Sequence, residues 1–495
     1  MGTIRKQSIL SSIFIYIGFA IGAVNILFLF PKYFTPEEFG LTRILVDIAL
    51  ILSTLCTAGA IPIAFKFFPY YESRLDRKSN DLMTIVFLMV LASCLIVYFL
   101  FPYFEPLFIR KFGARSPLLA YHVDLVMPLT ISLAFLGVME VFAWIAGKTI
   151  LANFSREMLL RIFVLLLIAG WITGVFKDYE SWIQTYSFIY FPLIGIVFIA
   201  VLSTQKFHLT FKFSNLTKRL RPMMLKFGGA YFLSAFLNII ARTNDTLIIA
   251  SQSAGGLADA AIFTIATYLI TVMDVPQRSM ISAATPQIAK AWKEKDLAKL
   301  DRLYKKTALN LLIIASAILG LVMINIPVLL NMLGPRYYGL PILLIILGIG
   351  KLIDLGTGLN SQILQLSKYW RIDLFTNMLF VGVSIVLNYI LTKKFGIIGT
   401  ASGTLMAIIL FNLIRFMYIK KIYGLQPFTK NNAVALFSAL LMTLSVCWLP
   451  VNDIFLAGFL KSLLFVTGFS CIIIGFNVSP DITELWTMAK NKFRR

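Results

Sequence analysis

The sequence predicts an all-α polytopic membrane protein with about 14 transmembrane helices. Of its 495 residues, 59% are hydrophobic and only 14% are charged, against about half and about a quarter in soluble domains. Apolar runs of about 20 residues, the length that crosses the hydrocarbon core as a helix, recur along the whole chain. No segment shows the alternation typical of an outer-membrane barrel. The composition therefore excludes a soluble enzyme, a disordered chain and a disulfide scaffold.

The apolar runs mark the expected spans. Each span must be helical, because lipid offers no water to satisfy the hydrogen bonds of the backbone. The runs cover 9–31, 41–65, 81–104, 121–144, 157–176, 182–203, 227–251, 259–283, 307–330, 341–364, 372–392, 397–418, 433–450 and 455–476.

The distribution of basic residues predicts the orientation in the membrane, since Lys and Arg gather in cytoplasmic loops. With the N-terminus inside, 31 of the 45 Lys and Arg residues fall on inside segments, 8 on outside segments and 6 within spans. Both termini are therefore expected in the cytoplasm. We attribute the net charge of +22 to contact with anionic lipid, not to nucleic-acid binding.

Weak internal symmetry suggests two related six-helix halves, a frequent plan in transporters. Spans two and eight both leave through a proline, Pro62 and Pro286, into aromatic and basic residues. The stretch 286–306 is expected to form an amphipathic helix on the inner leaflet. The expected parts are an N-terminal six-helix lobe (1–204), a basic cytoplasmic linker (205–226), a C-terminal six-helix lobe (227–420), and two extra transmembrane helices with a basic cytoplasmic tail (421–495).

The sequence lacks the common motifs of catalysis and cofactor binding. The text nearest to a phosphate-binding loop, GIGKL at 348–352, lacks the upstream Gly and the Ser or Thr. The four cysteines show no disulfide or metal-ligand spacing. We therefore expect no enzyme activity, no cofactor and no metal.

Ionisable residues inside the spans are the candidate functional residues, because a charge at bilayer depth costs about 2.5–3.5 kcal/mol on insertion scales. They lie in pairs spaced i,i+3 or i,i+4, so both members share one helix face. In one interpretation, each acid neutralises its own base. In the other, the faces line a central aqueous cavity where bases bind an anionic headgroup and acids pair or couple to an ion. The bases are Arg43, Arg242, Arg278 and Lys351, and the acids are Asp47, Asp245, Asp274 and Asp354.

Three segments resemble bacterial polysaccharide flippases. PKYFTPEEFGLTRILVDIALIL (31–52) looks like the first loop and second span of that family. GPRYYGLPILLIILGIGKLIDLGTGLNSQILQLSKYW (334–370) resembles its tenth span, and NYILTKKFGIIGTASGTLMAIILFNLIRFMYIKKIYGLQPF (388–428) its eleventh-to-twelfth span region. The resemblance implies the multidrug/oligosaccharidyl-lipid/polysaccharide exporter superfamily, with two six-helix lobes around a central cavity and two further helices in the lipid-exporting branches.

The resemblance implies transport of a polyprenyl-diphosphate-linked oligosaccharide from the inner to the outer leaflet of a bacterial cytoplasmic (inner) membrane by alternating access. Cavity bases of the family meet the diphosphate, and by position this role falls to Arg43, Arg242 and Arg278, with Lys351 as a further deep base. The implied partners are the lipid-linked oligosaccharide, membrane lipids and polysaccharide polymerase machinery, and a monomer is expected. Whether the glycan enters O-antigen, capsule, exopolysaccharide or a teichoic-type polymer stays open.

Two other functions stay open. A drug/cation antiporter of the same superfamily would have a cavity lined by acids and aromatic residues, and twelve spans are more usual there. A membrane polysaccharide polymerase or ligase would need a substantial outside loop with basic residues, whereas the expected loop at 104–120 is short.

Overall fold

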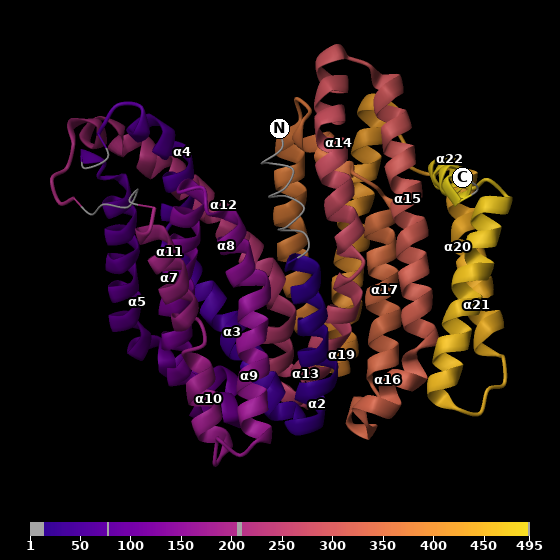
Figure 1. The fold of residues 1–495 in the computed structure, drawn as a ribbon, viewed down its shortest axis with the longest axis horizontal. Coiled ribbons are helices and arrows are strands. Elements are labelled where there is room, and N and C mark those ends of the chain that lie inside the picture. The colour runs from indigo at the N-terminus through magenta and orange to yellow at the C-terminus, as the bar shows by residue number, and fades with distance from the viewer. Residues whose placement is uncertain (1–13, 77–78, 205–209, 494–495) are drawn as a thin grey trace. The chain divides into compact units, whose positions relative to one another are not determined.

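A computed structural model describes residues 14–76, 79–204 and 210–493 (Figure 1). The start of span one, the first part of the expected linker and the end of the basic tail lie outside the described residues. The described part contains helices and no strand, which confirms the all-α prediction. Within it, eleven helices are long and apolar enough to cross a membrane, or twelve when one bent pair counts as a single span.

The chain divides into two compact units, Met1–Ala261 and Ile262–Arg495. A helix that covers residues 14–33 contains the first two elements of the first unit. The first unit contains η1 (Asn25–Leu29), α2 (Phe30–Tyr33), α3 (Pro36–Thr57), α4 (Ala60–Glu72), α5 (Leu82–Phe112), α6 (Pro117–Tyr121), η3 (Val123–Leu125), α7 (Val126–Ile145), α8 (Thr149–Phe154), η4 (Ser155–Leu159), α9 (Leu160–Ile172), α10 (Tyr179–Ser187), α11 (Phe191–Leu202) and α12 (Asn215–Gln252).

Helix α13 (Gly256–Thr271) crosses the division between the units. The second unit continues with α14 (Asp274–Glu294), α15 (Leu297–Ile324), α16 (Ile326–Leu333), η5 (Pro335–Tyr337), α17 (Leu340–Gly356), α18 (Asn360–Gln365), α19 (Trp370–Tyr423), α20 (Lys430–Cys447), α21 (Ile454–Gly475) and α22 (Pro480–Phe493).

The second expected span is broken into α3 and α4. Thr35 begins α3 as a capping box, in which its hydroxyl accepts from the Glu38 N–H (3.2 Å) and the Glu38 carboxylate accepts from the Thr35 N–H (2.8 Å). The helix ends at Ala58 and Gly59, which both have positive φ (45° and 79°). A side chain at Gly59 would lie 2.3 Å from the Gly228 carbonyl oxygen, so glycine lets α12 pass close to the break.

Helix α12 begins earlier than the sequence suggested. The Ser214 hydroxyl accepts from the Thr217 N–H at 3.2 Å and caps the helix, which then runs for 38 residues. The second half of the expected linker (205–226) is therefore the first part of α12. This helix packs on α3 and α4 and belongs to the first compact unit, whereas the lobes as units of transport stay a prediction.

The expected amphipathic helix at 286–306 is not one helix. Lys295 adopts a left-handed conformation (φ 54°) and ends α14, and the Asp296 carboxylate accepts from the Lys299 N–H at 2.8 Å and begins α15. The basic stretch is thus divided between the joined ends of two packed helices, which lie side by side in Figure 1. The sequence does have an amphipathic pattern here. It gives no sign of the turn, because the turn lies at a lysine and not at a glycine or proline.

Helix α19 joins the eleventh and twelfth expected spans without a loop. Gly396 has a non-helical conformation (φ 58°, ψ −141°) and reverses the chain. A side chain at Gly399 would lie 2.1 Å from the Leu391 carbonyl oxygen, and one at Gly403 would lie 2.3 Å from Asn388 Oδ1. The small residues of this run therefore let the two arms approach closely, as in membrane helix pairs generally.

The two extra helices pack on the second unit through α15. Ala435 and Ala439 of α20 and Phe465 and Phe469 of α21 form a buried apolar cluster with residues of α15. Gly320 of α15 makes room for the Phe465 ring, which a side chain at that glycine would meet at 2.4 Å. The appended pair is thus a packed part of this unit.

Candidate functional site: buried ionic clusters in each unit

In the first unit, α3 and α12 bring together an ionic cluster around Asp47. This carboxylate is fully buried, with 0% of its side chain exposed, and Arg43 Nη2 lies 3.1 Å from its Oδ1. The Thr246 hydroxyl of α12 donates to Asp47 Oδ2 at 2.5 Å. The expected pairing of Asp47 with Arg43 is confirmed, and sequence reasoning did not identify Thr246 as a partner.

Arg242 and Asp245 lie beside Thr246 on α12. Arg242 is exposed and Asp245 is half-buried, and both take part in polar or electrostatic interactions. Arg242 lies one helical turn before Thr246, so the geometry places a second base on the helix that contacts Asp47. Pairing between Arg242 and Asp245 stays a prediction.

A second ion pair in the first unit was missed by sequence reasoning. Arg156 Nη1 donates to Glu140 Oε2 at 2.9 Å, and the Glu140 side chain is buried. Arg156 lies between the expected spans 121–144 and 157–176, in a segment expected to be cytoplasmic. The structure places it in η4, within a continuous helical stretch from α8 to α9, which is why it can reach α7.

In the second unit, Lys351 of α17 lies between two carboxylates. Its Nζ forms an ion pair with Asp274 Oδ1 of α14 and another with Asp354 Oδ2 at 3.1 Å. The three side chains are between 18% and 26% exposed. The expected Lys351–Asp354 pair is confirmed, and the triad of one base and two acids carries a net charge of −1 when all three groups are ionised.

The structure does not pair Asp274 with Arg278, as the interpretation of self-neutralising pairs would require. Asp274 pairs with Lys351 instead, and Arg278 is exposed and has no ion-pair partner within 4.0 Å among the residues that the structure describes. Spacing along one helix showed that Asp274 and Arg278 share a face, but it could not show that a lysine on another helix lies closer. Arg278 is consequently a candidate base of this unit whose charge is available to another anion.

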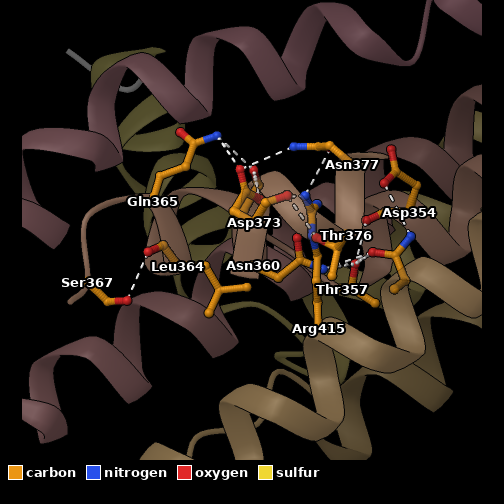
Figure 2. A network of polar contacts seen from close by, with 12 residues as sticks. Asp354, Thr357, Asn360, Leu364, Gln365, Ser367, Asp373, Thr376, Asn377 and Arg415 are labelled. Atoms are coloured by element: carbon orange, nitrogen blue, oxygen red, sulfur yellow. Dashed lines mark hydrogen bonds and ion pairs between the residues drawn. The ribbon is translucent and has the colours of Figure 1, made fainter. Parts of the chain in front are cut away.

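A third cluster lies at one end of the α19 hairpin, where Arg415 and Asp373 form an ion pair (Figure 2). Both side chains are 5% exposed or less. Arg415 Nε also donates to Thr376 Oγ1 at 3.0 Å and Nη2 to Asn377 Oδ1 at 3.1 Å. Phe411 covers the guanidinium, with its ring centroid 4.4 Å away. Arg415 lies near the end of the expected span 397–418 and was not among the candidate functional residues.

A separate set of amide contacts, drawn in part in Figure 2, joins the Lys351 triad. The side-chain oxygen of Asn412, Oδ1, accepts from the Thr357 hydroxyl at 2.9 Å and from the Asn360 side-chain amide at 2.8 Å. The Asn412 amide donates to Asp354 Oδ1 at 3.4 Å. These contacts give partners to polar groups in the interior of the second unit, where an unpartnered polar group would be costly.

An apolar groove of about 370 Å³ lies between α15, α17 and α20. Its lining includes Met323, Leu352 and Phe437, one from each of the three helices. Leu352 directly follows Lys351 in α17, so the groove and the ionic triad share this helix. The groove is lined almost wholly by apolar side chains, which suits an apolar ligand.

No group of three or more His, Cys, Asp or Glu side chains suited to a metal occurs in the part of the chain that the structure describes. The clusters are made of bases, acids, hydroxyls and amides. Such groups can bind an anion through Arg, hold a monovalent cation or proton at a carboxylate, or bond sugar hydroxyls.

The chain matches no protein-family model and no curated protein sequence. Solved structures are similar in fold. A structure titled lipid II flippase MurJ in an inward closed conformation matches with a TM-score of 0.70 and 19% identity, over 95% of this chain and 100% of that one. An inward-facing multidrug resistance MATE transporter matches with a TM-score of 0.53 and 17% identity, over 83% and 94%.

A third similar structure is that of the MATE multidrug transporter DinF-BH, with a TM-score of 0.52 and 16% identity over 88% of this chain and 98% of that one. At these identities the likeness concerns the fold. It confirms the polytopic architecture expected from the resemblance to the exporter superfamily, because flippase and multidrug transporter structures of that architecture both match nearly along their whole length.

Proposed function

We propose that this chain, which shares its fold with a lipid II flippase and with multidrug transporters, is itself a flippase for a polyprenyl-diphosphate-linked oligosaccharide. It would carry the headgroup from the inner to the outer leaflet of a bacterial cytoplasmic membrane by alternating access. The observation that supports this most is the full-length likeness to the flippase, over 95% of this chain, against 83% and 88% for the two multidrug transporters.

A diphosphate headgroup cannot cross hydrocarbon unaided, because removing water from its charges costs far more than thermal energy supplies. Guanidinium groups replace that water by bidentate, charge-assisted hydrogen bonds. We propose Arg43 and Arg242 for this role in the first unit and Arg278 in the second. Lys351 is the weaker candidate, since it would have to leave Asp274 or Asp354 to reach a phosphate.

Acids in the same clusters are proposed to pair with these bases or to couple transport to an ion. The net charge of −1 on the Asp274–Lys351–Asp354 triad supports uptake of one proton or monovalent cation there, and Asp47 and Asp245 are the candidates in the first unit. The membrane potential also favours export, because each negative charge moved outward gains about 2.3 kcal/mol per 100 mV. The apolar groove beside Leu352 is proposed to receive part of the prenyl tail.

A second candidate function is a drug/cation antiporter. Two observations favour it: the likeness to the multidrug transporters and the excess of acid over base in the Lys351 triad. An organic cation would be attracted to the two carboxylates, whereas a diphosphate would be repelled by them and held by Arg278.

The test uses the purified full chain in proteoliposomes with an imposed potassium potential. The substrate is a fluorescent polyprenyl-diphosphate sugar, and an impermeant quencher reports which leaflet holds it. We expect Arg242→Ala and Arg278→Ala each to slow flipping about tenfold to hundredfold, because a hydrogen bond to a charged group is worth about 1.5–3 kcal/mol. Arg336→Ala, at an exposed residue of an expected outside loop, is the matched control and should flip normally.

Two results would overturn the proposal. Wild-type protein that moves an organic cation but leaves the lipid-linked sugar in its original leaflet would establish the antiporter instead. Flipping at the wild-type rate in both arginine variants would remove the headgroup role of these residues and leave the clusters as structural pairs.

A further inference from the structure

The outer end of α5 carries basic residues that the transport clusters leave unexplained. Arg110, Lys111 and Arg115 are three of the eight basic residues on expected outside segments. Short outside loops normally exclude such residues, because they oppose the orientation of the protein in the membrane. Glu105 is the only acid within Leu82–Phe112, so this helix end is locally cationic.

The length of α5 carries these bases past the hydrocarbon core of the membrane. Its 31 residues make about 46 Å at 1.5 Å per residue, whereas the hydrocarbon core is about 30 Å thick. With Leu82 at the inner boundary, the last turns extend past the hydrocarbon. Arg110 follows Leu82 by 28 residues, about 42 Å along the axis, so a helix tilted by about 30° would bring Arg110 and Lys111 to the headgroup region.

A groove of about 700 Å³ opens at this helix end. Its walls are mainly aromatic and aliphatic, and its polar lining consists of Arg110, Lys111 and the Gln252 amide at the end of α12. The Phe108 ring stacks with the Phe112 ring at 6.3 Å between centroids and so shapes one wall. The groove therefore combines an apolar wall with two cations and an amide that can donate a hydrogen bond.

The groove is built on fixed backbone. The Ser116 hydroxyl, just after α5, donates to the Ala250 carbonyl oxygen of α12 at 2.7 Å, and Ser116 is buried. Gly256 packs so tightly on the loop that a side chain there would lie 1.9 Å from the Arg115 carbonyl oxygen. These contacts hold Gln252 beside the end of α5, so a ligand meets a preformed site and loses little entropy in ordering it.

We propose that this groove binds one anionic phospholipid of the outer leaflet. Its phosphate would lie on Arg110 and Lys111 with the Gln252 amide as a further donor, and an acyl chain would follow the wall at Phe108. Charge complementarity selects this occupant: a zwitterionic lipid brings its own cation and gains less from two bases, and a soluble anion would leave the aromatic wall in contact with water. The site does not depend on which substrate the clusters transport.

The test is native mass spectrometry of the delipidated full chain titrated with phosphatidylglycerol. We expect wild type to retain one tightly bound lipid and Arg110→Gln/Lys111→Gln to bind it roughly thirtyfold more weakly, from about 1 kcal/mol for each base near an anionic lipid. The matched control is Lys393→Gln/Lys394→Gln, which removes the other exposed pair of expected outside bases and should keep the lipid.

A photo-reactive phosphatidylglycerol locates the bound lipid. We expect it to label the peptide that ends at Phe112 in wild type, and not in the Arg110→Gln/Lys111→Gln variant. Four results would each overturn the proposal: equal retention of phosphatidylcholine, unchanged phosphatidylglycerol binding in that variant, labelling of another part of the chain, or displacement of the bound lipid by a polyprenyl diphosphate alone. An unchanged elution volume and an unchanged melting temperature show that a variant is folded. Flipping activity is a separate readout, so loss of the lipid site and failure of the flippase proposal can be told apart.

Discussion

Removing the guanidinium of Arg415 should destabilise the second unit by about 3 kcal/mol. Breaking a buried ion pair by removing one partner costs about 3–5 kcal/mol, because the other charge is left in a medium of low polarity. Asp373 would keep three neutral donors, from Ser361 (2.8 Å), Gln365 (2.9 Å) and Asn377 (3.3 Å). Each supplies on the order of 1 kcal/mol, which places the expected loss at the lower end of that range.

The measurement is the free energy of unfolding in bicelles for Arg415→Met, Asp373→Asn and the double variant, as a thermodynamic cycle. Methionine keeps much of the length of the arginine stem, so the change concerns charge more than volume. We expect the double variant to lose about 1–3 kcal/mol less than the sum of the single variants, since residues in one network are not additive. Arg371→Met, at an exposed arginine of the same helix, should stay within about 0.5 kcal/mol of wild type.

The reasoning would be refuted by an additive cycle. If the stability loss of the double variant equals the sum of the two single losses within about 0.5 kcal/mol, Arg415 and Asp373 do not stabilise one another, whatever their distance. A loss in Arg371→Met as large as that in Arg415→Met would likewise show that the assay reports arginine content and not the buried pair.

Two further predictions concern close approaches between helices. Gly399→Ala should destabilise the protein by about 1–3 kcal/mol, because the new methyl group meets the Leu391 backbone, whereas Gly382→Ala on the same helix meets nothing within 4 Å and should be neutral in the same unfolding assay. Thr246→Val removes the hydroxyl that donates to Asp47 at 2.5 Å and should lower the free energy of unfolding by about 1–3 kcal/mol. Thr246→Ser keeps the donor and should retain flipping in proteoliposomes. Equal behaviour of the two variants would contradict this role of Thr246.

Apolar run length was sufficient to predict the helical architecture, because backbone polar groups in lipid have no alternative to helices or closed barrels. It was less informative where a span bends without a break in hydropathy. Lys393 and Lys394 mark the reversal just before Gly396, whereas the break at Ala58–Gly59 lies inside an apolar run and has no such signal. Hydropathy measures transfer from water to lipid and carries no term for backbone conformation.

Spacing along one helix predicted Arg43–Asp47 and Lys351–Asp354, since a period of 3.6 residues fixes which side chains share a face. It could not predict partners on other helices, such as Thr246 for Asp47. Asp373 and Arg415 could have been found by one further step. In two antiparallel spans joined by a tight turn, an acid early in the first faces a base late in the second.

The loop-free reversal at Gly396 bears on how this region enters the membrane during synthesis. With only Lys393 and Lys394 between its apolar arms, α19 offers the insertion machinery a helical hairpin and not two separable segments. Asp373, at the start of one arm, and Arg415, near the end of the other, would then enter the membrane together as a neutral ion pair. Lengthening the reversal with a flexible polar insert should therefore impair membrane integration of the arms before it impairs any step of transport.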